Sequence, residues 1–190
     1  MQKPFSASRK KLTIMTKTEI RREMKALNKA MQPGERRCAA DNIIAQTERL
    51  EAFKNAHTVA LFCSLPDEPP TEEMIARWCR TKNIVLPRVE GDTMQFYPYD
   101  PAGMNKGAFG ITEPTGETPT EPAQIDLIIV PGVAFTASGE RLGRGKGYYD
   151  KYLSSPGFNA TKVGICYAHQ LRPELPCEPH DMKMDCVIAG

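Results

Sequence analysis

The sequence predicts an α/β fold: a single three-layer domain with a mostly parallel central sheet flanked by helices. Two continuous apolar runs of strand length, at 58–63 and 126–131, are typical of strands buried on both faces of a sheet. They alternate with segments whose apolar residues recur at helical spacing. A chain of 190 residues that is 41% hydrophobic fits one domain with a substantial core.

Residues 1–15 precede the patterned part of the chain. They are basic, with no acid before Glu19, and they contain no apolar segment of the kind found in a secretory signal. We interpret residues 1–15 as a disordered extension or as the product of a start codon assigned too early, with a transit peptide as the alternative. Residues 16–190 are expected to form the single domain.

Two helices are expected before the first strand. The first starts at Lys17 with Thr16 or Thr18 as its cap, and Pro33-Gly34 ends it. The second spans about 35–53. The predicted inward residues are Ile20, Met24, Leu27 and Met31 in the first helix, and Ile43, Ile44, Thr47 and Leu50 in the second.

The rest of the chain alternates between strands and helices. A strand at 58–63 leads through a loop at 66–70 to a helix capped by Thr71. A long loop rich in Pro, Gly and Thr is expected at 100–125. The other expected elements are strands at 83–89, 94–99, 126–131, 161–167 and 185–189, and a glycine-rich turn running into a helix at 145–155.

The composition excludes several classes of protein. The 25 basic and 23 acidic residues nearly balance, which argues against a nucleic-acid-coating role, and no apolar run approaches the length of a membrane span. The six cysteines form no CxxC pair, and the three histidines show no zinc-ligand spacing with them. We therefore expect free thiols, a cytoplasmic protein, no nucleic acid or membrane partner, and a monomer.

The segment 139–150 carries the strongest chemical signal. Gly143, Gly145 and Gly147 allow close approach of the backbone to a ligand. Arg141, Arg144 and Lys146 place three cations among them, which favours binding of an anion, above all phosphate. A surface hairpin is the alternative interpretation of these glycines. The pattern is neither a Walker A loop nor a dinucleotide-binding fingerprint, because Glu140 and Tyr148 occupy positions where those motifs need glycine.

Carboxylates near this segment are candidate ligands for a metal ion. Mg²⁺ prefers oxygen ligands, and Asp150 closes the glycine-rich segment. Asp181 and Asp185 lie before the last strand, where Asp181 is either a ligand or a turn cap. The roles of Asp185 and of His180 stay open at this point.

The decapeptide Arg-Leu-Gly-Arg-Gly-Lys-Gly-Tyr-Tyr-Asp at 141–150 closely resembles the signature of the 5-formyltetrahydrofolate cyclo-ligase family, also called methenyltetrahydrofolate synthetase. Weaker matches follow in family order between residues 17 and 188. They lie at 17–21, at Asp67-Glu68 with Thr71, at 109–114, at 126–135 and at 180–185.

This resemblance implies a reaction and two substrates. ATP and 5-formyltetrahydrofolate would give ADP, phosphate and 5,10-methenyltetrahydrofolate, with Mg²⁺ as cofactor. The formyl oxygen would attack the γ-phosphoryl group, and N10 would then close on the activated carbon as phosphate leaves.

The resemblance also implies roles for individual residues. Arg141, Arg144 and Lys146 would be catalytic, and Asp150 and Asp181 would bind Mg²⁺. The implied ATP-binding residues are Lys17, Arg21, Arg141, Leu142, Gly143, Arg144, Gly145, Lys146, Gly147, Tyr148 and Tyr149. The implied folate-binding residues are Cys63, Glu68, Phe109, Arg144, Gly145, Lys146, Gly147 and Tyr148, with loop packing as the alternative role of Phe109.

Two other functions are compatible with the glycine-rich segment. Another phosphate-handling α/β enzyme would need a general base near the loop, and the histidines are distant in sequence. A nucleotide- or RNA-binding module could stack bases on Tyr148 and Tyr149, but Asp150 and Asp181 would repel a phosphate backbone unless a metal bridged them.

Overall fold

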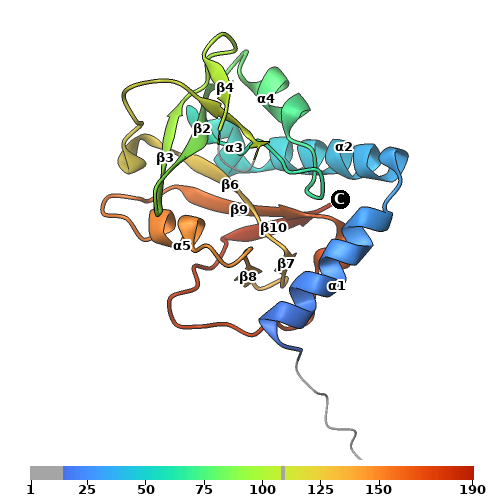
Figure 1. Ribbon diagram of the computed structural model, residues 1–190. Coiled ribbons are helices and arrows are strands. Elements are labelled where there is room, and N and C mark those ends of the chain that lie inside the picture. The colour runs from blue at the N-terminus through green and yellow to red at the C-terminus, as the bar shows by residue number, and fades with distance from the viewer. Residues whose placement is uncertain (1–14, 108–109) are drawn as a thin grey trace, which may run out of the picture.

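The computed structural model describes residues 15–107 and 110–190 (Figure 1). The expectations for residues 1–14 and for Phe109 therefore concern residues outside the described part. A six-stranded sheet of order β10-β9-β6-β1-β2-β3 forms the centre, and its neighbouring strands are parallel except for the edge strand β3. The strands are β1 (Thr58–Ala60), β2 (Asn83–Glu90), β3 (Thr93–Pro98), β6 (Leu127–Pro131), β9 (Thr161–Cys166) and β10 (Cys186–Ala189).

Helices cover both faces of this sheet. The helices are α1 (Lys17–Ala30), α2 (Pro33–Arg49), α3 (Glu51–Asn55), α4 (Glu72–Trp78) and α5 (Tyr148–Leu153). Helices α2, α3 and α4 contribute Ile43, Phe53 and Trp78 to the core on one face. Helix α5 contributes Tyr152 to the core on the other face, where its ring packs on Phe96 with centroids 4.7 Å apart. The three-layer α/β fold is confirmed.

The strand β6 shows why the sequence pattern led to this fold. Its first four residues are fully buried because they alternate between the two cores, with Leu127 and Ile129 on one face and Ile128 and Val130 on the other. Asp126 precedes β6 and accepts hydrogen bonds from the backbone N–H groups of His57 and Thr58 at 2.7 and 2.8 Å. These bonds align the starts of β1 and β6.

Helix α1 begins as predicted, but its inner face differs. Thr16 and Glu19 form a reciprocal capping box. Ile20 and Met24 are buried, whereas Leu27 is 40% exposed and Asn28 takes the inward position. The prediction for Leu27 was wrong because Asn28 has a polar partner inside, the backbone carbonyl of Asp67, 2.9 Å from Asn28 Nδ2.

The predicted helix 35–53 is two helices. Helix α2 starts at Pro33, since the fixed φ of proline suits the first helical position, and the proline therefore begins α2 rather than separating the helices. Leu50 has an extended backbone, which ends α2 and allows α3 to start in a new direction.

Several predicted boundaries need correction. Strand β1 ends at Ala60 rather than at Cys63, and Thr71 does not cap α4 through its side chain, because its hydroxyl donates to the carbonyl of Phe62. The predicted long loop contains a hairpin, β4 (Met104–Lys106) and β5 (Thr112–Pro114), and a short 3-10 helix, η2 (Pro122–Gln124). Further elements that the sequence did not indicate are the ribbon of β7 (Ala134–Phe135) and β8 (Arg141–Leu142), and the 3-10 helix η3 (Ala168–Gln170).

The structure also bears on the cysteines and on membrane-spanning helices. All six cysteines are free. Within residues 15–107 and 110–190, no helix combines the length and apolar character that crossing a membrane requires.

Candidate active site

A cavity of about 960 Å³ opens at the carboxyl ends of β1 and β6. These strands are neighbours, yet the chain continues from β1 to β2 on one side and from β6 to β9 on the other. Such a switch in strand order leaves a crevice at which open α/β sheets bind ligands. Phe62 and Cys63, which follow β1, and Pro131 and Gly132, at the end of β6, line the cavity. The sheet itself therefore positions the site.

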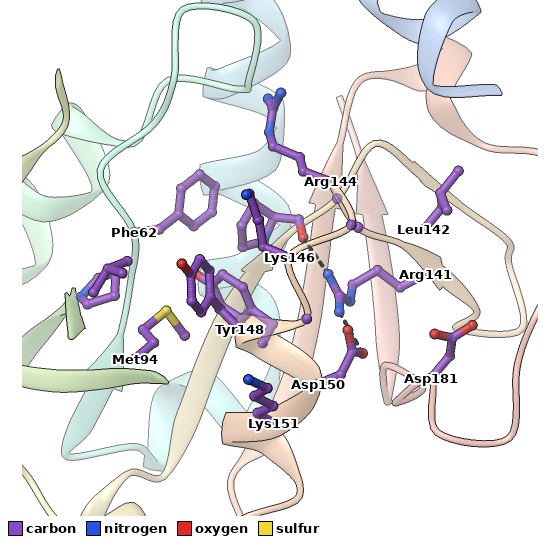
Figure 2. Close-up of a pocket in the computed structure, with 18 of the residues that line it drawn as sticks. Phe62, Met94, Arg141, Leu142, Arg144, Lys146, Tyr148, Asp150, Lys151 and Asp181 are labelled. Carbon is purple, nitrogen blue, oxygen red and sulfur yellow. Dashed lines mark hydrogen bonds and ion pairs between the residues drawn. The ribbon is translucent and has the colours of Figure 1, made fainter. Parts of the chain in front are cut away.

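The cavity brings together the predicted site residues from four distant parts of the chain. Each predicted residue within the described part lines it, and Phe109 is the one outside that part. The predicted lining residues are Lys17, Arg21, Cys63, Glu68, the segment 141–150 and Asp181. Figure 2 shows Arg141, Arg144, Lys146, Tyr148, Asp150 and Asp181 around this space.

The glycine-rich segment leaves the ribbon of β7 and β8 and enters α5. Gly147 is the N-cap of α5 with a φ of 73°, which is a left-handed conformation that glycine adopts without strain. Arg21 of α1 donates from Nε to the carbonyl of Gly143 at 3.0 Å. Helix α1 therefore holds the segment from outside the sheet.

Arg141 is the most buried cation of the site. Its side chain is 4% exposed and donates from Nη2 to Asp150 Oδ1 at 2.7 Å. Its guanidinium also lies 5.7 Å from the centre of the Tyr149 ring. Its Nε has no acceptor among the described residues. These contacts fix the guanidinium in place before any ligand arrives.

Arg144 joins the glycine-rich segment to the turn after β1. Its Nη2 lies 2.7 Å from Asp67 Oδ1, and its Nη1 lies 3.3 Å from Asp67 Oδ2. Its Nε donates to Glu68 Oε1 at 3.0 Å. Glu68 is buried, and a buried carboxylate needs a partner such as Arg144 to balance its charge. The pair therefore belongs to the cavity wall and is not an exposed surface ion pair.

Lys17 and Asp181 form a further ion pair, with Lys17 Nζ 2.9 Å from Asp181 Oδ2 and 3.3 Å from Glu178 Oε1. Partial burial alone would lower the pKa of Lys17, but the hydrogen bonds and charges of the two acids raise it overall. Partial burial would likewise raise the pKa of Asp181, and the bonds from Lys17 and from the backbone N–H of Glu178 lower it overall. Both groups are therefore charged at neutral pH.

Lys146 differs from the other predicted cations. No ion pair or hydrogen bond joins its ammonium group to another described residue, whereas Arg141, Arg144 and Lys17 each contact a carboxylate. Its side chain is exposed and lines the cavity (Figure 2). It is therefore available to an incoming anion without first breaking an ion pair.

A hydrogen bond joins the segments that carry Asp150 and Asp181. Asp150 Oδ1 accepts from the backbone N–H of Met182, next to Asp181, at 3.2 Å. Within the described residues, Asp150 Oδ2 and Asp181 Oδ1 accept no hydrogen bond from the protein. Glu178, His180 and Asp181 also place one ligand atom each within 4.8 Å of one another. The carboxylate oxygens of Asp150, Glu178 and Asp181 are donors that suit Mg²⁺, whereas His180 offers a ring nitrogen.

The opposite wall of the cavity is apolar, which sequence reasoning missed. Its residues look like ordinary core residues in the sequence, and only the sheet topology shows that they face a cavity. They are Phe62, Leu65, Pro87, Val89, Met94 and Ile111. Cys63 lies beside them, and burial, followed by the charges of Glu72 and Glu113, raises the pKa of its thiol to about 11. This thiol is protonated at neutral pH and therefore unsuited to nucleophilic attack.

Asp185 has a structural role. Its Oδ2 accepts from the backbone N–H of Lys162 at 2.7 Å and lies 2.9 Å from the ammonium group of the same residue. It therefore aligns the starts of β9 and β10, and it does not line the cavity. His180 does line the cavity, 3.1 Å from Glu178.

Comparison with known proteins adds an independent observation. Residues 13–190 match the family model of the 5-formyltetrahydrofolate cyclo-ligase family. A probable 5-formyltetrahydrofolate cyclo-ligase of Schizosaccharomyces pombe is 34% identical over 77% of this chain and 81% of its own length. The mouse 5-formyltetrahydrofolate cyclo-ligase is 26% identical over 90% of each chain.

Solved structures agree with the sequence comparisons. The 5,10-methenyltetrahydrofolate synthetase of Aquifex aeolicus matches with a TM-score of 0.83 and 35% identity, over 92% of this chain and 90% of the other. The 5,10-methenyltetrahydrofolate synthetase of Mycoplasma pneumoniae matches with a TM-score of 0.76 and 25% identity, over 92% and 98%.

Proposed function

Because this chain belongs to the 5-formyltetrahydrofolate cyclo-ligase family, a family of ligases, we propose that it uses ATP and Mg²⁺ to convert 5-formyltetrahydrofolate into 5,10-methenyltetrahydrofolate. The observation that carries the proposal is the composition of one cavity. Cations and acids line one side of it, and an apolar wall lines the other. This arrangement suits a substrate pair in which a polyphosphate must meet a flat, largely apolar ring system.

The phosphate groups of ATP would lie against the glycine-rich segment. Phosphoryl transfer depends mainly on positioning and on neutralising the charge that develops on the transferred group. Arg141 is already fixed by Asp150, and Lys146 has no competing ion pair among the described residues. We propose Arg141, Arg144 and Lys146 as the catalytic residues, with Lys17, Arg21 and the segment 142–149 completing the nucleotide site.

The folate would lie against the apolar wall. Phe62, Val89 and Met94 offer a surface for the pterin and aminobenzoyl rings, and Cys63 adds a neutral thiol. Glu68 points its carboxylate at Arg144, so that it can accept from the N–H groups of the pterin while Arg144 balances its charge. Gly145, Gly147 and Tyr148 then lie between the two substrates in the cavity wall, and Phe109 stays a predicted contact.

Asp150 and Asp181 are the residues that would hold Mg²⁺. The fit rests on the two carboxylate oxygens that accept no hydrogen bond from the described residues, and on the bond that joins their two segments. When bound, Mg²⁺ would neutralise charge on the phosphate oxygens.

The chemistry needs no strong general base. The formyl oxygen attacks the γ-phosphorus of ATP, the bond to the bridging oxygen breaks, and ADP leaves. Folate N10 then attacks the formyl carbon, the carbon–oxygen bond breaks, and the former formyl oxygen departs with inorganic phosphate while N10 loses its proton. The cations of the glycine-rich segment stabilise the charge on both leaving groups.

The remaining expectations follow the same proposal. We propose that residues 16–190 act as one domain and that the protein works as a monomer in the cytoplasm, without nucleic acid or membrane partners. The six free cysteines support a reducing compartment.

The test is the growth of methenyl absorbance from 5-formyltetrahydrofolate, with and without ATP and Mg²⁺. We expect growth that requires both, and a fall in kcat/KM of about 10²-fold or more in Lys146→Ala. The matched control is Lys54→Ala, which removes an exposed lysine of α3 that does not line the cavity. Absence of product from a folded protein that binds ATP would overturn the proposal, and product formation unaffected by Lys146→Ala would move the phosphate site elsewhere.

A further inference from the structure

Three consecutive backbone carbonyls after β1 each accept a hydrogen bond from a different side chain. The carbonyl of Pro66 accepts from Arg36 Nη1 at 2.8 Å, and that of Asp67 accepts from Asn28 Nδ2 at 2.9 Å. The carbonyl of Glu68 accepts from Tyr167 Oη at 2.8 Å. The donors come from α1, from α2 and from Tyr167, the residue that follows β9. The turn at 66–68 is therefore held by side chains from elements that are separate in sequence.

The three donors also contact one another. Arg36 Nη1 lies 3.3 Å from Tyr167 Oη, and Arg36 Nη2 donates to the carbonyl of Asn28. Asn28 and Tyr167 are 4% and 0% exposed. In a buried hydrogen-bond network, removing one partner leaves another polar group unsatisfied. Each of the three side chains therefore helps to hold the other two in place.

His169 fixes the orientation of the Asn28 amide. Its Nε2 lies 2.5 Å from Asn28 Oδ1, which can only accept, so Nε2 carries the proton. Asn28 Nδ2 is then directed at the carbonyl of Asp67. The His169 ring stacks on that of Tyr167, with centroids 5.8 Å apart. The side chain that supports Asp67 and the one that supports Glu68 are therefore held by the same histidine.

The turn that these residues hold carries two acids of the active site. Glu68 Oε2 accepts from the backbone N–H of Leu65 at 2.9 Å, which closes the turn, and Glu68 Oε1 faces Arg144. Asp67 pairs with the same arginine. Among the described residues, Asn28, Arg36, Tyr167 and His169 do not line the large cavity. They contact the site through the backbone of the turn.

We propose that Asn28, Arg36 and Tyr167 are positioning residues for folate binding, which hold the turn at 66–68 so that Glu68 meets the pterin and Arg144 keeps its place. This proposal rests on the proposed function. A carboxylate that must accept from several N–H groups of a flat ring needs a fixed position, and a loop held at three successive carbonyls supplies it.

Tyr167→Phe tests the proposal by removing one hydroxyl group without changing the shape of the core. We expect the KM for 5-formyltetrahydrofolate to rise about five- to tenfold, which corresponds to one lost hydrogen bond, with kcat changed less than twofold. The control is Tyr152→Phe, because the buried hydroxyl of Tyr152 has no hydrogen-bond partner among the described residues. Its KM and kcat should stay unchanged.

Amide hydrogen exchange provides a readout that does not need activity. The backbone N–H groups of Leu65 and Glu68 are bonded within the turn, so Tyr167→Phe should lower their protection about tenfold, and Tyr152→Phe should not. Asn28→Asp provides a second variant: it keeps the acceptor for His169 and removes the donor to Asp67. It should show the same loss of protection and the same rise in KM.

The outcomes separate this proposal from the proposed function. Unchanged KM and unchanged protection in both variants would overturn the positioning role, as would lost protection with unchanged KM. A wild-type protein that neither binds nor converts the folate would overturn the proposed function and the folate role with it, while the exchange data would still show whether the three side chains hold the turn.

Discussion

Arg141 Nη2 lies 2.7 Å from Asp150 Oδ1, and 4% of the Arg141 side chain is exposed to solvent. The pair joins β8 to the first turn of α5, so it closes the glycine-rich segment between them. The same aspartate accepts from the backbone N–H of Met182. One carboxylate therefore fixes the proposed catalytic cation Arg141 and also binds the segment that carries Asp181.

Replacing this carboxylate should destabilise the protein even without ligands. Asp150→Asn leaves a buried guanidinium without its counter-charge, and we expect the free energy of unfolding to fall by about 2 kcal/mol, somewhat less than for a fully buried pair because Asp150 is partly exposed. Urea unfolding measures this. The control is Asp92→Asn, which breaks the exposed pair with Lys151 and should change the free energy by less than about 0.5 kcal/mol. Equal effects in both variants would contradict the prediction.

Three glycine substitutions should separate backbone strain from steric overlap. Gly147→Ala should lower the free energy of unfolding by about 1 kcal/mol, because φ is positive while no atom lies within 4 Å of the new methyl group. Gly139→Ala should lower it by at least about 2 kcal/mol, since its methyl group would overlap the carbonyl of Met184. Gly34→Ala, in the first turn of α2, should raise it by about 0.5 kcal/mol. Thermal unfolding would show whether this order holds.

His169 should make stability depend on pH. Burial, followed by the charge of Arg36, lowers its pKa in the folded protein below the ordinary value of 6.5. The unfolded chain therefore binds a proton more readily, so the free energy of unfolding should be at its full value above pH 6.5 and fall as the pH drops below it. Unfolding curves between pH 7.5 and 5 measure this slope. His169→Asn should flatten it and His57→Asn, at an exposed site, should not; a slope that survives in His169→Asn would assign the proton to another group.

The contrast between the two halves of the cavity shows what the sequence could predict. Arg141, Arg144 and Lys146 lie in one short segment with alternating glycines, so local sequence was sufficient to single them out. Phe62 follows β1, Pro87 lies in β2 and Met94 lies in β3, and all three have the same apolar character as core residues. Their position depends on the order of β1, β2 and β3 in the sheet, which no local pattern carries.

Dependence on residues distant in sequence also explains why some helix and strand predictions were wrong. Leu27 and Asn28 are adjacent in α1, and apolar periodicity selected Leu27, because the partner that draws Asn28 inward is a backbone carbonyl 39 positions away. The ribbon of β7 and β8 has two residues in each strand, too few for any periodic pattern. The strand β6 was predicted to within one residue because burial on both faces constrains nearly every position in it.

Lys17 should compete with Mg²⁺ for Asp181 if that residue binds the metal ion. The ammonium group of Lys17 lies 2.9 Å from Asp181 Oδ2, so a metal ion at Asp181 would bind beside a cation. Lys17→Met should therefore raise the affinity for Mg²⁺ alone several-fold and lower the affinity for ATP, because the proposed phosphate contact is lost. Isothermal titration of each ligand separately measures both effects. Lys183→Met, an exposed lysine near Glu140, is the control and should change neither affinity. A lower Mg²⁺ affinity in Lys17→Met would show that Lys17 supports the metal site instead of competing with it.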